Sequence, residues 1–312
     1  MVRHVISWKD WTGKELAEMI DLGLDMKKDP EKYNQALKDK TLIMLFEKTS
    51  TRTRLSFEIG MTKLGGHGIF FDWQKSNIGV TEANLEAAVM SRYADFIMAR
   101  LKKNETLMKL AKGATVPVIN ALDEKYHPCQ GLADYMTVKE KAGEYAKARM
   151  IYVGIANNVS NSLISAGTKL GCEVVLVTPE KDPDAVDGEL EEQARKTGLY
   201  HEMGTVKEAL ETEKKCFVYT DTWVNLEYFN DPAFAEEKER RLKTFMPLQL
   251  NKKMIEGKED ALIMHCMPVH VSYEMNEDIL PENYENNIMY DQAENRMWAQ
   301  MGLLAWLDRH AT

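Results

Sequence analysis

A dense group of hydrogen-bond donors lies within the sequence EKTSTRTRLSFEIG, at residues 47–60. The apolar run 41–46 before it has the length and composition of a buried strand, and the apolar residues after it recur at roughly helical spacing. A helix N-terminus exposes unpaired N–H groups and a partial positive charge, so donors at such a junction can bind a small, highly charged anion. The pattern predicts a phosphate site, although Ser50 or Thr51 could simply cap the helix and the arginines could pair with surface carboxylates. The group comprises Thr49, Ser50, Thr51, Arg52, Thr53 and Arg54.

Further polar groups follow predicted strands or begin predicted helices. Each has an ordinary structural explanation, namely a helix cap, a turn or a solvated strand end. His265 and Cys266 could bind a metal ion together with His270, but this set lacks a fourth ligand. The groups matter together because they fall at the same end of their strands, where α/β proteins build binding sites. They are Arg100, His127 and Gln130 in HPCQ, Asn157 and Asn158 in NNVSNS, Asp221 in YTDTW, His265 and Cys266 in HCMP, and Arg296 in DQAENR.

The composition is that of a soluble globular protein long enough for two domains. The 312 residues carry a formal net charge of -9 without a Lys and Arg stripe, which argues against a nucleic-acid partner. No apolar stretch approaches the roughly 18 residues that a membrane span needs, and the first residues lack a signal-peptide core, so we expect a cytoplasmic protein without a membrane partner. The four cysteines show no CxxC spacing, which argues against a zinc ribbon or a disulfide framework.

The elements that must position these groups alternate along the chain. This alternation of strands and helices predicts an α/β protein of two doubly wound parallel-sheet domains, with the active site in the cleft between them. The polar segment 139–149 marks the boundary and gives domains 1–143 and 144–312, with a last helix at 292–308 that we expect to pack back on the first domain. Strand-like apolar runs occur at 42–46, 68–71, 95–99 and 116–120, and again at 150–154, 173–178, 216–219, 262–265 and 287–290.

Six short motifs make the sequence resemble a known family. STRTR, HPCQ, NNVSNS, DTW, HCMP and DQAENR occur in the order and approximate spacing of the aspartate/ornithine carbamoyltransferase family, over nearly the whole chain. The resemblance implies a first domain that binds carbamoyl phosphate, a second that binds an amine, and a homotrimer with sites shared between subunits. It implies no metal and no organic cofactor. Within the family the chain looks most like the enzymes of arginine metabolism that carbamoylate the side-chain amine of L-ornithine, giving L-citrulline and phosphate.

The resemblance also assigns individual residues. Arg100, His127 and Cys266 are implied as catalytic, with Arg100 and His127 on the carbonyl oxygen of the carbamoyl group. Asn77 is implied to serve the site of a neighbouring subunit. The full carbamoyl phosphate set is Ser50, Thr51, Arg52, Thr53, Asn77, Arg100, His127, Gln130, Cys266, Met267 and Arg296. The ornithine set is Asn158, Asp221, Asn225 and Leu226.

The chemistry of a carbamoyl transfer suits these residue types. An amine attacks the carbamoyl carbon, negative charge builds on the carbonyl oxygen, and phosphate leaves. Donors preorganised around both groups stabilise that charge, and holding two substrates in one orientation removes an entropic part of the barrier. The amine, with a reference pKa of about 10, must also lose a proton. No side chain is an obvious dedicated base, and the phosphate can accept this proton itself.

Three departures from the family pattern concern the substrate. The Ser-Met-Gly tripeptide of ornithine enzymes reads Asn225-Leu226-Glu227, so a charged residue replaces glycine. The loop that resembles Ser-Gln-x-Gly reads Ser76-Asn77-Ile78-Gly79, which shortens the expected glutamine by one methylene. Cys129 replaces a threonine next to a helix start, where the pKa of its thiol could be lowered or the side chain could serve only for packing.

Other members of the family remain as alternatives. Putrescine carbamoyltransferase also departs from Ser-Met-Gly, so putrescine or another amine stays open as the substrate. Aspartate is disfavoured because Val269 stands where the aspartate enzymes carry an arginine. A catalytically silent anion-binding homologue would be expected to lose at least one residue of a set that is complete here, namely Arg52, Arg100, His127 and Arg296.

Overall fold

The computed structural model describes residues 2–224 and 228–311, and the chain divides into two compact units. Unit 1 comprises Met1–Thr137 and Glu294–Thr312, and unit 2 comprises Val138–Ala293. The boundary predicted after residue 143 lies just beyond α5 (Pro128–Ala142), and it remains a prediction about where independent domains would separate.

Unit 1 is built on a four-stranded parallel sheet in the order β2-β1-β3-β4. The central strand β1 is buried from Leu42 to Phe46, which explains its unbroken apolar sequence. Because all four strands run the same way, the residues that follow β1, β3 and β4 emerge along one edge of the sheet. The strands are β1 (Thr41–Phe46), β2 (His67–Asp72), β3 (Phe96–Arg100) and β4 (Val118–Leu122).

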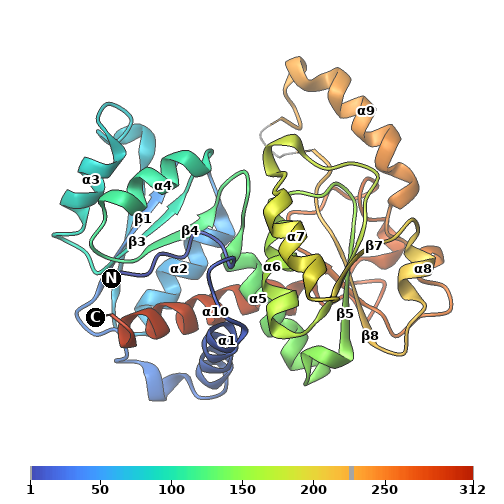
Figure 1. The fold of residues 1–312 in the computed structure, drawn as a ribbon, viewed down its shortest axis with the longest axis horizontal. Helices are drawn as coiled ribbons and strands as arrows, with labels where there is room; N and C mark the ends of the chain where they lie inside the picture. The colour runs from blue at the N-terminus through green and yellow to red at the C-terminus, as the bar shows by residue number, and fades with distance from the viewer. Residues whose placement is uncertain (1, 225–227, 312) are drawn as a thin grey trace. The chain divides into compact units, whose positions relative to one another are not determined.

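Helices cover both faces of this sheet. In Figure 1, α3 and α4 lie on one side of it, and α1 and α10 lie on the other. A Cβ atom on Gly302 would lie 2.3 Å from the carbonyl oxygen of Met19, so α1 and α10 can cross this closely only with glycine there. The crossing fixes the helix that carries Arg296. The helices are α1 (Gly13–Lys28), α2 (Thr51–Lys63), α3 (Ala83–Met90), α4 (Asn104–Gly113), α5 and α10 (Met289–Arg309).

Unit 2 contains a five-stranded parallel sheet in the order β7-β6-β5-β8-β9. β5, β8 and β9 are neighbours, so Asn157, Asp221 and Cys266, which follow them, emerge at the same edge. The strands are β5 (Ala148–Val153), β6 (Glu173–Val177), β7 (Tyr200–Glu202), β8 (Lys215–Thr220) and β9 (Leu262–His265). The helices are α6 (Asn158–Leu170), α7 (Gly188–Lys196), α8 (Val206–Leu210) and α9 (Ala235–Phe245).

The two parallel sheets confirm the predicted α/β class. The strand predicted at 287–290 is wrong. Asn287 makes a single bridge with Ile263, and its side chain accepts a hydrogen bond from the Met289 N–H as α10 begins. The edge strand β7 was not predicted, because its three residues include polar His201 and Glu202 and form no apolar run.

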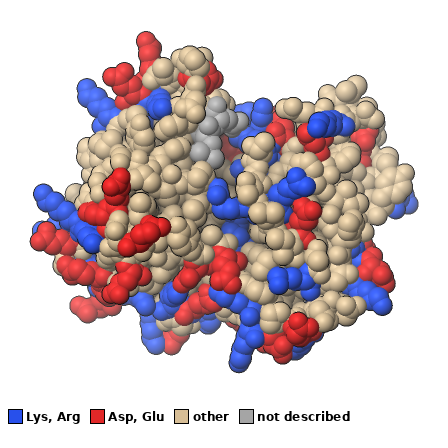
Figure 2. Space-filling model, turned by 180° about the vertical axis from the view of Figure 1, so that it is seen from behind, with Lys and Arg blue, Asp and Glu red and all other residues tan. Residues whose placement is uncertain are grey.

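The surface carries charges of both signs. On the face drawn in Figure 2, acidic and basic side chains are interspersed, and no basic stripe crosses that face. Among the helices within the two described ranges, none combines the length and apolar character that crossing a bilayer requires. The four cysteines, all within the described ranges, form no disulfide, and Cys266 is the most exposed of them.

Candidate functional site

The predicted anion cluster lies at the N-terminus of α2, directly after β1. Ser50 is the N-cap: its hydroxyl accepts a hydrogen bond from the Thr53 N–H at 3.3 Å and donates to Thr53 Oγ1 at 3.0 Å. The two arginines of the motif differ. Arg54 pairs with Glu58 at 3.1 Å and lies over the Phe70 ring, so it has a structural role. Arg52 instead interacts electrostatically with His127.

His127 lies at the start of α5, buried among positive charges. Burial lowers the pKa of its imidazole well below the ordinary value, and the guanidinium groups of Arg296, Arg100 and Arg52 lower it further. Arg52 lies in the first turn of α2, Arg100 ends β3 and Arg296 lies in the first half of α10. Unit 1 gathers these three arginines around one histidine. The result is a concentration of positive charge beside a neutral imidazole, which suits a phosphorylated ligand with a polar carbonyl group.

Arg296 connects the C-terminal helix to this group. Its side chain is 3% exposed and donates to Gln130 Oε1 at 2.6 Å and to Thr53 Oγ1 at 3.4 Å. Gln130 in turn donates from Nε2 to Asp134 Oδ1 at 2.8 Å, which settles the orientation of its amide. α2, α5 and α10 therefore share one hydrogen-bonded network within unit 1.

Asn77 lies on an exposed turn between β2 and α3. Its carbonyl oxygen accepts hydrogen bonds from the N–H groups of Val80 and Thr81, so the turn is held by its own backbone. These contacts involve only the backbone of the turn, so the role of the Asn77 side chain in a neighbouring subunit stays a prediction.

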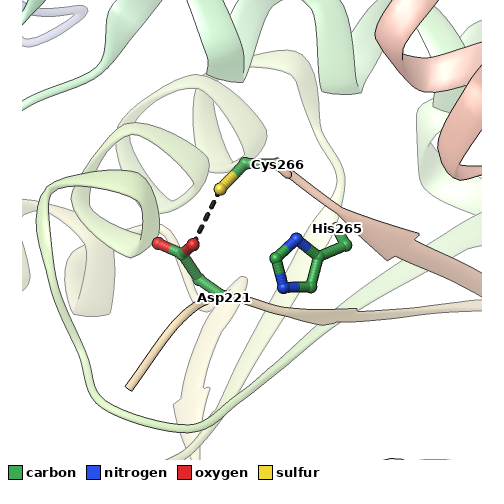
Figure 3. A group of neighbouring side chains, drawn as sticks. All are labelled: Asp221, His265 and Cys266. Carbon is green, nitrogen blue, oxygen red and sulfur yellow. Dashed lines mark hydrogen bonds between the residues drawn. The ribbon is translucent and has the colours of Figure 1, made fainter. Parts of the chain in front are cut away.

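A second polar cluster lies in unit 2, at the ends of β8 and β9. Figure 3 shows the Cys266 thiol pointing at the Asp221 carboxylate, with a Sγ to Oδ1 distance of 2.7 Å. Asn157 Nδ2 donates to the other oxygen, Oδ2, at 2.8 Å, and the Thr222 N–H donates to Oδ1. Asn158 is the first residue of α6, next to this group. Asp221 is thus a buried carboxylate with a fixed orientation, as a site for an ammonium group requires.

His265 supports the loop that carries Cys266 and Met267. Its Nδ1 accepts the Met267 N–H at 2.7 Å, so the ring proton sits on Nε2, which faces the buried carboxylate of Glu274 at 3.4 Å. Met267 has a left-handed backbone with φ of 59°, and this hydrogen bond holds it there. The backbone of Met267, which is expected to contact carbamoyl phosphate, is therefore held in one conformation.

The cluster in unit 2 contains two of the residues considered as metal ligands, His265 and Cys266. Asp221, His265 and Cys266 do form a group whose ligand atoms lie within 4.8 Å of one another. However, the His265 lone pair receives the Met267 N–H, and the thiol donates to the carboxylate. A metal ion would have to break both hydrogen bonds. His270, the third expected ligand, instead stacks on Phe229 at 3.9 Å.

The lowered thiol pKa considered for Cys129 is wrong: the side chain is fully buried, and burial raises its pKa to about 12. Its thiol donates to the Asn120 carbonyl oxygen, which is a packing role.

The predicted ornithine residues Asn225 and Leu226 lie outside the described residues. Sequence reasoning also missed Asn157 as a partner of Asp221, since it gave a role at the amine to Asn158 alone.

Comparisons with known proteins cover nearly the whole chain. The family profile described as aspartate/ornithine carbamoyltransferase, carbamoyl-P binding domain, matches residues 3–140, and the profile for the Asp/Orn binding domain matches residues 146–307. The chain is 39% identical to an ornithine carbamoyltransferase of Thermococcus kodakarensis over 310 residues, covering 97% of this chain and 95% of that protein. It is 40% identical to an anabolic ornithine carbamoyltransferase of Pyrococcus furiosus over 314 residues, covering 97% and 95%.

Solved structures agree with the sequence comparison. The ornithine carbamoyltransferase structure from Pyrococcus furiosus superposes with a TM-score of 0.87 at 38% identity, covering 97% of this chain and 96% of that one. The anabolic enzyme from Campylobacter jejuni gives a TM-score of 0.87 at 32% identity, covering 99% and 100%. Together with the two profile matches, these similarities show that the chain belongs to the aspartate/ornithine carbamoyltransferase family.

Proposed function

We propose that this protein transfers the carbamoyl group of carbamoyl phosphate to the side-chain amine of L-ornithine, giving L-citrulline and phosphate. The observation that carries the proposal is the gathering of Arg52, Arg100 and Arg296 around a buried His127 in the unit that matches a carbamoyl-P binding domain. The full-length similarity to ornithine carbamoyltransferases supports the choice of amine.

Unit 1 supplies what the departing phosphate needs. The guanidinium groups compensate the phosphate dianion, and the N–H groups at the start of α2 add donors of fixed position. His127 is neutral, so it can donate one hydrogen bond to the carbamoyl oxygen without adding to the repulsion among the three arginines. Gln130 is oriented by Arg296 and Asp134 and would hold the carbamoyl amide. Such preorganised donors stabilise charge as it develops on oxygen.

Unit 2 supplies the amine site. Asp221 would bind the α-ammonium group of ornithine, and Asn158 would donate to its carboxylate. Cys266 and Asn157 hold the Asp221 carboxylate in place from both sides. In the reaction the side-chain nitrogen forms a bond to the carbamoyl carbon while the bond from that carbon to the phosphate oxygen breaks. The amine proton passes to the departing phosphate.

We also propose that the enzyme is a trimer in the cytoplasm. Support for assembly comes from large apolar side chains exposed on and beside α3, because exposed apolar groups of this kind mark interaction surfaces. Cysteines that form no disulfide are typical of a reducing compartment. The exposed side chains are Val80 at 86%, Tyr93 at 77%, Leu85 at 60% and Val89 at 49%.

A colorimetric assay for ureido products tests the proposed activity directly. Carbamoyl phosphate is offered with L-ornithine, putrescine, lysine, aspartate and N-acetylornithine in parallel, and we expect the highest kcat/KM with ornithine. Equal or better use of putrescine would make the protein a putrescine carbamoyltransferase. No product with any amine would support a silent anion-binding homologue.

A further inference from the structure

A buried carboxylate in unit 1, which the proposed reaction does not use, lies four residues before His127. Asp123 is fully buried in the turn between β4 and α5. Its Oδ1 atom accepts the backbone N–H groups of Lys125 at 2.8 Å and Tyr126 at 2.7 Å. The backbone of the same turn closes with a hydrogen bond from the Asp123 N–H to the Tyr126 carbonyl oxygen at 3.0 Å. These bonds hold the two residues immediately before His127.

The other carboxylate oxygen connects this turn to its surroundings. Asp123 Oδ2 accepts the side-chain amide of Asn104, the first residue of α4, at 2.7 Å, and that of Asn120, in β4, at 2.9 Å. Asn120 also donates to the Ile6 carbonyl oxygen. The turn is thereby fixed to a strand, a helix start and the N-terminal segment at once.

We propose that Asp123 is a positioning residue for His127, which acts by fixing the backbone turn that carries the imidazole into the group of arginines. The proposal rests on the proposed role of His127 at the carbamoyl group. A charged residue is costly at this depth, and burial raises the pKa of Asp123 to about 6 in spite of its four donors. A turn cap alone would need only a hydroxyl, whereas four converging donors require both carboxylate oxygens.

Glu124 offers a matched control in the same turn. Its carboxylate accepts the backbone N–H of Asn104 at 2.6 Å, so it caps α4 and not the segment that leads to His127. Glu124→Gln and Asp123→Asn each remove one negative charge and change the side chain by one amide. We expect Glu124→Gln to retain kcat/KM within about twofold, because this part-buried bond holds the start of α4 and the new amide oxygen can still accept the Asn104 N–H. Asp123→Asn should lose at least about tenfold, because the amide places N–H groups against other donors.

A double-mutant cycle in the full-length enzyme separates positioning from general support. We expect His127→Ala to lose about 100-fold or more in kcat, as removal of an oxyanion donor does. Adding Asp123→Asn to His127→Ala should then cost less than about threefold, because the group that Asp123 positions is already absent. The KM for ornithine should not change. Calorimetric affinity for carbamoyl phosphate is measured in all four proteins, so the cycle can be read even without turnover.

Asp123→Ser and Asp123→Ala keep the test decisive if Asp123→Asn folds poorly. Serine still offers an acceptor to the turn and alanine does not, so we expect the serine variant to exceed the alanine variant by about fivefold in kcat/KM. An additive loss in the His127→Ala background, or a fully active Asp123→Asn, would overturn the positioning role alone. A fully active His127→Ala would overturn both this role and the place of His127 in the proposed reaction.

Discussion

His127 combines burial with three neighbouring positive charges, so its imidazole resists protonation. The unfolded chain would bind a proton at this histidine near pH 6.5, whereas the folded protein does so only at lower pH. The unfolded state therefore holds more protons in the window below pH 6.5, and the free energy of unfolding decreases as pH falls through that window. The same property keeps the imidazole neutral at the pH where the enzyme would work.

We therefore expect His127→Gln to lose less stability than the parent between pH 7.5 and pH 5.0. The difference can approach about 1.4 kcal/mol for each pH unit in which only the unfolded histidine is protonated. Urea unfolding at both pH values measures it. Asp123 acts in the opposite direction, since its raised pKa makes stability fall as pH rises between about 4 and 6. An identical pH response in His127→Gln and the parent would contradict a lowered pKa at this position.

The two arginines of the α2 motif make a matched pair for a binding experiment. Arg52→Ala removes a charge-assisted contact to the phosphate, a loss of roughly 1.5 to 3 kcal/mol, so carbamoyl phosphate should bind at least about tenfold more weakly. Arg54→Ala removes the same charge two residues away, but this side chain is engaged with Glu58 and Phe70. We expect Arg54→Ala to retain parental affinity by calorimetry. Unchanged affinity in Arg52→Ala would place the anion site elsewhere.

At the scale of elements, apolar runs located most of the strands. All four predicted strands of unit 1 and four in unit 2 coincide with observed ones. Seven of these eight are largely buried, and buried parallel strands need nearly continuous apolar sequence, whereas β2 is apolar but largely exposed. The two strands that were predicted wrongly or missed have local reasons. β7 is short and polar at an edge, and the run at 287–290 makes only one bridge, at Asn287, before α10 begins at Met289.

The sequence did not predict side-chain contacts between different elements. The motif at 50–53 predicted an anion site, but only the family resemblance separated Arg52 from Arg54. The residue types alone could not, because the distinction depends on Phe70 in a neighbouring strand. Asn157 and Asp221 are 64 positions apart, and periodicity carries no information about such a pair. The depth of Cys129 likewise depends on the packing around α5, which decides the direction of its pKa.

The start of α6 provides a prediction at this scale. Asn157 caps the helix through Oδ1 and holds Asp221 through Nδ2. Asn157→Ser keeps a good cap but loses the donor to Asp221, so we expect an unchanged Tm and a KM for ornithine raised by about tenfold. Asn157→Ala should show the same KM and also lose about 1 kcal/mol of stability. Steady-state kinetics measures the KM for ornithine, and thermal unfolding measures the stability. A parental KM in Asn157→Ser would mean that the bond to Asp221 has no part in binding ornithine.

At the scale of the whole molecule, the exposed turn 76–80, α3 and the turn that follows α3 share one property. They present large apolar side chains to solvent, including Val80 and Tyr93, although most apolar groups of unit 1 are buried. Asn77 lies at the start of this surface, on a turn fixed by its own backbone hydrogen bonds. If the surface binds a second copy, Asn77 is carried with it toward another subunit's phosphate group, and each site needs residues from two chains.

This arrangement predicts complementation between inactive subunits. Arg52→Ala damages a subunit's own site, whereas Asn77→Ala damages the site of its neighbour, so each variant alone should be nearly inactive. In randomly mixed trimers of equal composition, about a quarter of the sites combine an intact Arg52 with an intact Asn77 from the next chain. We expect the mixture to recover activity toward that fraction after subunit exchange. Arg52→Ala exchanged with itself is the control and should stay inactive. If verified mixed trimers recover nothing, Asn77 does not serve a neighbouring site, and the exposed surface around α3 must have another purpose.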